Sequence, residues 1–158
     1  MSFKCARTLI CTAFVAGLPT VGLTQTADTI VVLDVSGSMW GQIDGRTKIE
    51  IARDAFTDIS QDWIKNDNRP GLVAYGHRHK GDCRDIELLT APGESTATAL
   101  SNVVNSLTPL GKTPLSDAVR LAAEELKYTE NAANVILLSD GRETCDADPC
   151  AVLSLIHI

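Results

Sequence analysis

Two short, uninterrupted apolar runs constrain the fold of this chain more than any other feature of its sequence. Residues 29–33 are Thr-Ile-Val-Val-Leu and residues 134–138 are Asn-Val-Ile-Leu-Leu, and neither run alternates apolar with polar side chains. Continuous runs of this length, rich in β-branched residues, are typical of strands buried on both faces, as in a parallel sheet. Residues 70–75 predict a third strand, and the more alternating residues 85–90 predict an edge strand.

Helical patterns separate these strands. Apolar residues recur along one helical face from Lys48 to Lys65, from Glu94 to Leu107 and from Pro114 to Glu130. The dipeptide Thr113-Pro114 is a favourable helix start, because threonine can accept a bond from the first turn and proline is tolerated at the first helical position. Strands alternating with helices predict an α/β layered fold with a mostly parallel central sheet flanked by helices.

The N-terminal segment has the features of an export signal. Lys4 and Arg7 precede an apolar stretch from Thr8 to Leu18, which is short for a membrane-spanning helix. We therefore expect a signal peptide over residues 1–27 and a periplasmic, secreted or cell-envelope location. An uncleaved N-terminal anchor is the alternative, and it is the only membrane attachment that we expect.

One domain is expected over residues 28–158, since the chain has 158 residues and no linker or repeat. A further helix start is predicted at Asp148-Pro149. The chain then ends on the apolar residues Ile156-His157-Ile158, without a polar tail. We therefore expect a partial domain, with a fold that is incomplete at the C-terminus.

The cysteine content indicates a disulfide in an oxidising compartment. Cys5 and Cys11 lie in the predicted signal, so Cys83, Cys145 and Cys150 are the disulfide candidates of the body. Three cysteines allow one bridge and one remaining thiol. Cys145 and Cys150 could bridge each other, or one of them could reach Cys83, and the sequence leaves this choice open.

The charge of the chain argues against some classes of partner. The formal net charge is −6, which disfavours nucleic acid or an anionic membrane surface as the main partner. Apolar residues make up 44% of the chain and charged residues 22%, close to the values of ordinary globular proteins.

Polar side chains follow both apolar runs where ligands bind in open α/β sheets. Asp34, Ser36 and Ser38 follow the first run, Asp140 follows the last, and Thr113 stands at the start of a predicted helix. These oxygen ligands suit magnesium, manganese or calcium, and a site with few carboxylates fits magnesium best. Because hydroxyls are neutral, the bound ion would keep positive charge and attract a carboxylate of another protein.

The same residues resemble the metal-ion-dependent adhesion site of the von Willebrand factor A family. The matching parts are Asp34-x-Ser36-x-Ser38, then Thr113, then Ser139-Asp140-Gly141, all in the family's order. The resemblance covers about residues 28–155 and points to a bacterial secreted or envelope branch. It implies a Rossmann-like three-layer sandwich.

The resemblance also implies a role for each position. Ser36, Ser38 and Thr113 would contact the metal directly, whereas Asp34 and Asp140 would act directly or through water. A partner's acidic side chain would complete the coordination. The implied function is partner binding through the ion, without enzyme activity and without a small-molecule substrate.

Three other interpretations of these residues are possible. In the first, the ion only stabilises the fold of one part of an envelope assembly. In the second, Asp34 is a phosphoryl-accepting nucleophile, but Ser36 stands where that chemistry usually needs a second acid. In the third, His77, His79 and Cys83 bind zinc, although their spacing matches no zinc motif. Trp40 is expected either to contact a partner or to cover the helix below it.

Overall fold

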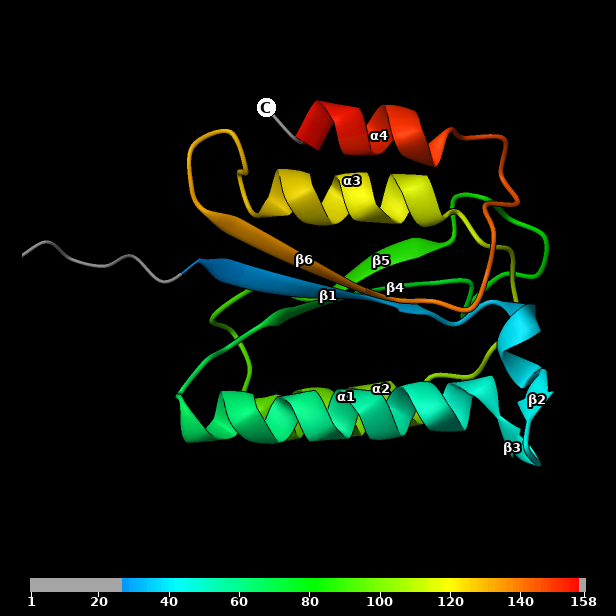
Figure 1. Cartoon of the computed structure of the whole chain (residues 1–158), viewed down its shortest axis with the longest axis horizontal. Coiled ribbons are helices and arrows are strands. Elements are labelled where there is room, and N and C mark those ends of the chain that lie inside the picture. Colours follow the sequence, from blue (N-terminus) through cyan, green and yellow to red (C-terminus); the bar gives the residue numbers. More distant parts are fainter. Residues whose placement is uncertain (1–26, 157–158) are drawn as a thin grey trace, which may run out of the picture.

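A four-stranded sheet lies between two layers of helices in the computed structural model, which describes residues 27–156 (Figure 1). In chain order the elements are β1 (Asp28–Asp34), the 3₁₀ helix η1 (Gly37–Trp40), β2 (Gln42–Ile43), β3 (Arg46–Thr47), α1 (Lys48–Lys65), β4 (Gly71–Tyr75), β5 (Ile86–Thr90), α2 (Ala97–Ser106), α3 (Leu115–Glu125), β6 (Ala133–Leu138) and α4 (Pro149–Ile156). Helices α1 and α2 cover one face of the sheet, and α3 and α4 lie on the other (Figure 1).

The sheet is mostly parallel, as the sequence predicts. Its strand order is β5-β4-β1-β6. Strand β1 pairs in parallel with β4 and β6, whereas β5 pairs antiparallel with β4 at the edge. The predicted Rossmann-like α/β sandwich and the predicted edge strand are therefore confirmed.

Strand β1 supplies the core on both sides of the sheet, because successive side chains of a strand point to opposite faces. Val31 and Leu33 pack in the cluster that also contains Phe56, Trp63, Leu100 and Val104. Ile30 and Val32 pack in the opposite cluster with Ala118, Ala122 and Leu126. Burial of an aliphatic side chain of this size stabilises the fold by about 1.5–3 kcal/mol. Both clusters hold β1 rigidly where it delivers Asp34.

Strand β6 differs from the expectation of a strand buried on both faces. Its residues are half-buried or exposed, and Leu137 retains 39% of its accessible surface. The physical reason is its place in the sheet, since within the described residues β6 pairs only with β1. The apolar run of β6 therefore predicts the strand correctly but not how far the strand is buried.

Two predicted helices are shorter than expected, and their ends explain why. The Thr96 hydroxyl accepts a hydrogen bond of 3.2 Å from the Ala99 amide, so α2 begins after Thr96 and not at Glu94. Helix α3 ends at Glu125, and Lys127 then has a φ of 50°, which is incompatible with a continuing helix. Helix α1 has the predicted bounds, and α4 begins at Pro149 as predicted.

A small hairpin between η1 and α1 was not predicted. Strands β2 and β3 are antiparallel and are joined by Asp44 and Gly45, which have φ values of 49° and 82°. Two central residues with positive φ are the mark of a two-residue hairpin turn, for which Asp-Gly is a strong sequence signal.

The predicted signal peptide lies outside the described residues, apart from Ala27. No helix within residues 27–156 has the length and apolar character needed to cross a membrane.

Candidate metal site

The two predicted carboxylates meet at one edge of the sheet. Asp34 is the last residue of β1, and Asp140 follows β6 by two residues. Because β1 and β6 are parallel and Leu33 is paired with Leu138, their carboxyl ends reach the same edge. The Asp34 side chain is fully buried there, whereas the Asp140 side chain is 14% exposed.

The turn after β1 links these carboxylates through two hydroxyls. The Ser36 amide donates a 2.8 Å hydrogen bond to Oδ1 of Asp34. The Ser36 and Ser38 hydroxyls lie 2.9 Å apart, and Ser38 donates a 3.0 Å hydrogen bond to Oδ1 of Asp140. The turn into η1 therefore places four of the five predicted ligand residues in one continuous series of hydrogen bonds.

Thr113 is the fifth predicted ligand and lies beside Asp34. A Cβ atom added to Gly141 would lie 3.4 Å from Oδ2 of Asp34 and 3.7 Å from the Thr113 hydroxyl oxygen. Thr113 is buried, with 4% exposure. Hard oxygen donors of this kind fit a divalent cation such as magnesium, manganese or calcium.

The expected capping role of Thr113 is wrong. Helix α3 begins at Leu115, and no side chain caps it from Pro114. Instead, the Ser116 amide donates a 2.9 Å hydrogen bond to Oε2 of Glu143. Glu143 satisfies this helix terminus from outside the helix, and the Thr113 hydroxyl stays near Asp34.

Close backbone contacts form the floor of the site. The Gly37 amide donates to the Gly111 carbonyl at 2.9 Å, and the Gly111 amide donates to the Gly76 carbonyl at 2.7 Å. Gly76 has a φ of 71°, and a Cβ atom there would lie 2.6 Å from the Lys112 carbonyl oxygen. Only glycine suits such a position, so Gly76 fixes the distance between the loops that carry Ser36 and Thr113.

Ser139 supports the site from below, a role that the sequence did not reveal. Its hydroxyl donates to Oδ2 of Asp34 at 2.7 Å and accepts from the Tyr75 hydroxyl at 3.2 Å. Burial, followed by the negative charge of Asp34, raises the pKa of the Tyr75 hydroxyl. Tyr75 therefore stays neutral and remains a donor to Ser139.

Lys48 is the other contributor that was not predicted. Its ammonium group donates to Oδ2 of Asp140. A cavity of about 530 Å³ opens at this point, and it is lined by Ser36, Ser38, Lys48, Gly111, Lys112, Thr113, Asp140, Gly141, Arg142 and Thr144. A signal for Lys48 existed, because a cation in the first turn of a helix is disfavoured by the helix dipole and calls for a partner.

A disulfide fastens the loops around this cavity. Cys83 is bonded to Cys145, and Cys150 is free and exposed. The Thr144 hydroxyl accepts a 2.9 Å bond from the Thr113 amide, and the Thr144 amide donates to the Thr113 carbonyl at 3.2 Å. Among the pairings that the sequence left open, the structure therefore has Cys83 with Cys145, next to a segment tied to Thr113.

The zinc interpretation of His77, His79 and Cys83 does not agree with this structure. Cys83 is in the disulfide, and Nε2 of His77 lies 3.1 Å from Oε2 of Glu87. Among residues 27–156, no three His, Cys, Asp or Glu side chains lie close enough together to hold a metal ion by themselves. The oxygen site is different in kind, because three of its five donors are hydroxyls.

A buried carboxylate holds the loop that contains Cys83. Asp85 is fully buried and accepts bonds of 2.8 Å from the amides of Arg78 and His79 and from Nε of Arg78. Burial alone would raise the pKa of the Asp85 carboxyl. The hydrogen bonds from His79 and Arg78 outweigh it and leave that pKa below its ordinary value.

Trp40 is hydrogen-bonded to a loop and largely exposed, and the partner contact considered for it stays a prediction. Its indole N–H donates a 2.9 Å hydrogen bond to the Pro109 carbonyl, which anchors η1 to the loop before Gly111. The side chain nevertheless remains 53% exposed beside the metal-site loop.

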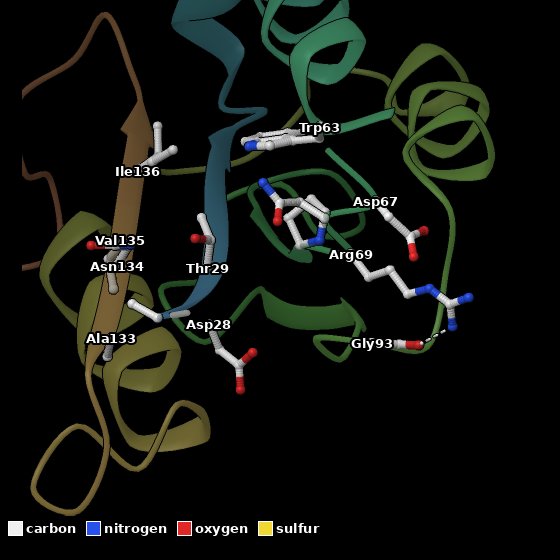
Figure 2. A pocket seen from close by; sticks show the side chains of 13 residues that line it. Asp28, Thr29, Trp63, Asp67, Arg69, Gly93, Ala133, Asn134, Val135 and Ile136 are labelled. Atoms are coloured by element: carbon white, nitrogen blue, oxygen red, sulfur yellow. Dashed lines mark hydrogen bonds between the residues drawn. The ribbon is translucent and has the colours of Figure 1, made fainter. Parts of the chain in front are cut away.

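A larger cavity of about 870 Å³ lies at the opposite, amino end of β1 and β6 (Figure 2). Asp28, Thr29, Trp63, Arg69 and Asn134 are among its lining residues, and the Arg69 guanidinium donates to the Gly93 carbonyl at 3.3 Å. None of the predicted ligands lines it. Ala27, the first described residue, also lines this cavity, so we assign the cavity no function.

One domain family and two known proteins are similar to this chain in sequence. A family model for the von Willebrand factor type A domain matches residues 29–143. The chain is 28% identical to the uncharacterised protein YwmD and 26% identical to the uncharacterised protein YwmC, both of Bacillus subtilis. The alignments cover 88% and 78% of this chain but 66% and 58% of those proteins. The chain therefore spans less than two-thirds of the length of these relatives.

Two solved structures show the same fold. The vWF domain of the type V pili tip protein Mfa5 from Porphyromonas gingivalis matches with a TM-score of 0.59 and 20% identity, over 78% of this chain and 42% of that chain. The SpRpn10 VWA domain matches with a TM-score of 0.58 and 17% identity, over 76% of this chain and 62% of that chain. From the family match and the shared fold we conclude that the chain belongs to the von Willebrand factor type A domain family.

Proposed function

We propose that this chain is an exported protein-binding module whose partner is engaged through a divalent cation. The ion would be held by Asp34, Ser36, Ser38, Thr113 and Asp140. The observation that carries the proposal is the series of hydrogen bonds that runs from Asp34 through both serines to Asp140.

The donor chemistry supports magnesium, with manganese and calcium as substitutes. All five side chains offer oxygen, and only two of them are carboxylates. The two carboxylates only balance the charge of a divalent ion, and the hydroxyls add no negative charge that would repel a further anionic ligand. A carboxylate on a partner protein has the required charge.

Binding is favoured over catalysis because Asp34 is already engaged at both of its oxygens. Oδ1 accepts from the Ser36 amide and Oδ2 accepts from the Ser139 hydroxyl. A carboxylate that attacks a substrate needs a free, exposed oxygen, whereas Asp34 is fully buried. We therefore assign it to holding the ion.

Export is part of the same proposal. The Cys83–Cys145 bridge is stable in the oxidising compartments outside the cytosol. The basic and apolar pattern of residues 4–18 supports the same route. One similar structure belongs to a pilus tip protein, and a location in the envelope or outside the cell suits an adhesive role.

Calorimetric titration of magnesium, manganese and calcium tests the proposal. The wild-type chain should bind one ion saturably, and Asp34→Ala should abolish binding. Asp58→Ala is the matched control, because Asp58 is exposed on α1 and should leave binding unchanged. No binding of any of the three ions by a folded wild-type protein would refute the proposal. Partner binding that persists in a chelator would favour the purely fold-stabilising ion.

A further inference from the structure

Lys48 is built into the candidate metal site although it carries the same sign of charge as the ion. It is the first residue of α1, and its ammonium group pairs with Oδ2 of Asp140, 92 positions away. The other oxygen of Asp140 accepts the hydrogen bond from Ser38. Lys48 is 29% exposed at its side chain and Asp140 14%, so water screens this pair only partly.

The turn at Gly41 leaves room for the Lys48 side chain. A Cβ atom added to Gly41 would lie 3.2 Å from Cε and 3.5 Å from Nζ of Lys48. The Lys48 amide in turn donates a 2.9 Å hydrogen bond to the Gly41 carbonyl. Glycine at this position therefore leaves the room through which the lysine reaches Asp140.

Helix electrostatics make this placement unfavourable on its own. The amino end of a helix carries partial positive charge, which repels a cation in the first turn. Glu50 in the same turn accepts from the Thr47 amide and hydroxyl, at 2.8 Å and 2.6 Å, and so caps the helix. The compensating partner of Lys48 is Asp140, so the lysine belongs to the site.

The charges of these groups determine what a loaded site would attract. Asp34 and Asp140 together contribute two negative charges, and a divalent cation would balance them. Lys48 adds one positive charge, so the ion-loaded site carries a net positive charge that only an additional anion can balance. Without Lys48 the charges of the ion and of the two carboxylates would sum to zero. Lys112 and Arg142 also line the cavity, but neither forms a salt bridge with these carboxylates among the described residues.

We propose that Lys48 is a fixed counter-ion that couples the metal to an anionic ligand. It weakens the binding of the divalent cation, because two like charges share Asp140. It strengthens the binding of a carboxylate to the loaded site, because its charge gives that site a net positive charge. This inference rests on the proposed function, and it names Lys48 as the residue that makes ion and carboxylate bind cooperatively.

Manganese binding with and without acetate tests the coupling. The full chain is titrated with Mn²⁺, first in chloride and then in saturating acetate. Binding is measured as the loss of the electron paramagnetic resonance signal of the free ion. In wild-type protein, acetate should tighten Mn²⁺ binding. Lys48→Met should bind Mn²⁺ roughly tenfold more tightly in chloride, because a like charge paired with the same carboxylate is removed, and should lose most of the acetate effect.

Two variants separate charge from structure. Lys48→Arg keeps the charge and should behave as wild type. Lys112→Met removes a lysine that lines the same cavity but forms no salt bridge among the described residues, and it should change Mn²⁺ affinity much less. Circular dichroism establishes that each variant is folded.

The possible failures are distinguishable. If wild-type protein binds Mn²⁺ but Lys48→Met binds it equally or more weakly, Lys48 only orients Asp140 and the inference is overturned. An acetate effect that is as large in Lys48→Met as in wild type overturns it as well. Failure of the folded wild-type chain to bind Mn²⁺ would instead remove the proposed function, and the inference with it.

Discussion

Ser139 donates a hydrogen bond of 2.7 Å to Oδ2 of Asp34, although the two residues are 105 positions apart. The parallel pairing of β1 with β6 brings them together. The Tyr75 hydroxyl, at the end of β4 on the other side of β1, donates a hydrogen bond to Ser139. The buried Asp34 carboxylate is thereby oriented through three adjacent strands. Ser139 is a positioning residue for the candidate metal site.

Ser139→Ala should weaken ion binding without removing any proposed ligand. Residues that orient metal ligands typically contribute about ten- to a hundredfold to affinity, and we expect a loss in that range for Mn²⁺ measured by calorimetry. Ser106→Ala is the control, because Ser106 is exposed at the end of α2 and bonds only locally to Val103. Unchanged Mn²⁺ affinity in Ser139→Ala would show that Asp34 is held well enough by Ser36.

Loss of the disulfide should destabilise the fold. The bridge closes a loop of 62 positions, and a loop of this size typically contributes about 2–4 kcal/mol to the free energy of unfolding. Cys83→Ser and Cys145→Ser should each lose that amount in urea denaturation. Cys150→Ser should lose nothing, since Cys150 is free and exposed. Equal losses in all three variants would contradict the assigned pairing.

Asp85→Asn should destabilise the protein at neutral pH by about 2–3 kcal/mol, because a charged acceptor of several buried hydrogen bonds is replaced by a neutral amide. The pKa of the Asp85 carboxyl is lower in the folded state than its ordinary value of 3.8. Its contribution is therefore present above that value and is lost as the pH falls through the lower, folded-state pKa. The stability difference between wild type and Asp85→Asn should accordingly shrink in strong acid.

Denaturation curves from neutral pH down to strong acid measure this difference. Asp82→Asn is a useful comparison, because Asp82 lies in the same loop but is more exposed and pairs mainly with the exposed Arg84. A difference between wild type and Asp85→Asn that stays constant at all pH values would argue that the Asp85 carboxylate contributes by its shape and not by its charge.

The strands and the meeting of the candidate ligands at one edge of the sheet could be predicted, because both leave local signals. The apolar runs at residues 29–33 and 134–138 end directly before Asp34 and Ser139-Asp140, and parallel strands bring their carboxyl ends together. Thr113 was identified as a hydroxyl at a predicted helix start, and the family resemblance joined it to the other four residues. The features that could be predicted are therefore those that a single strand or turn determines by its own sequence.

The supporting residues were missed because their partners are distant in the chain. Lys48 contacts a residue 92 positions away, and Glu143 caps a helix 27 positions before it. Such contacts depend on the register between β1 and β6 and on the course of loops that no local periodicity encodes. The expected cap by Thr113 failed for the same reason, since Glu143 had taken its place.

Gly76→Ala should disrupt the floor of the candidate metal site. Gly76 has a φ of 71°, and a Cβ atom would lie 2.6 Å from the Lys112 carbonyl oxygen and 3.0 Å from Cα of Ser36. Both obstacles are backbone, so they cannot swing aside as a flexible side chain would. Left-handed strain contributes about 1–2 kcal/mol, and overpacking typically adds about 1–3 kcal/mol.

Gly45→Ala separates these two terms. Gly45 has a φ of 82°, but no atom lies within 4 Å of its hypothetical Cβ, so only the left-handed strain of about 1–2 kcal/mol should appear. Thermal denaturation should therefore rank wild type above Gly45→Ala and Gly45→Ala above Gly76→Ala. Mn²⁺ binding should survive in Gly45→Ala and fail or weaken strongly in Gly76→Ala, because Ser36 and Thr113 lose their spacing. Equal stability of the two variants would mean that the loops around Gly76 can separate at little cost, and the site would then be less preorganised than its close backbone contacts indicate.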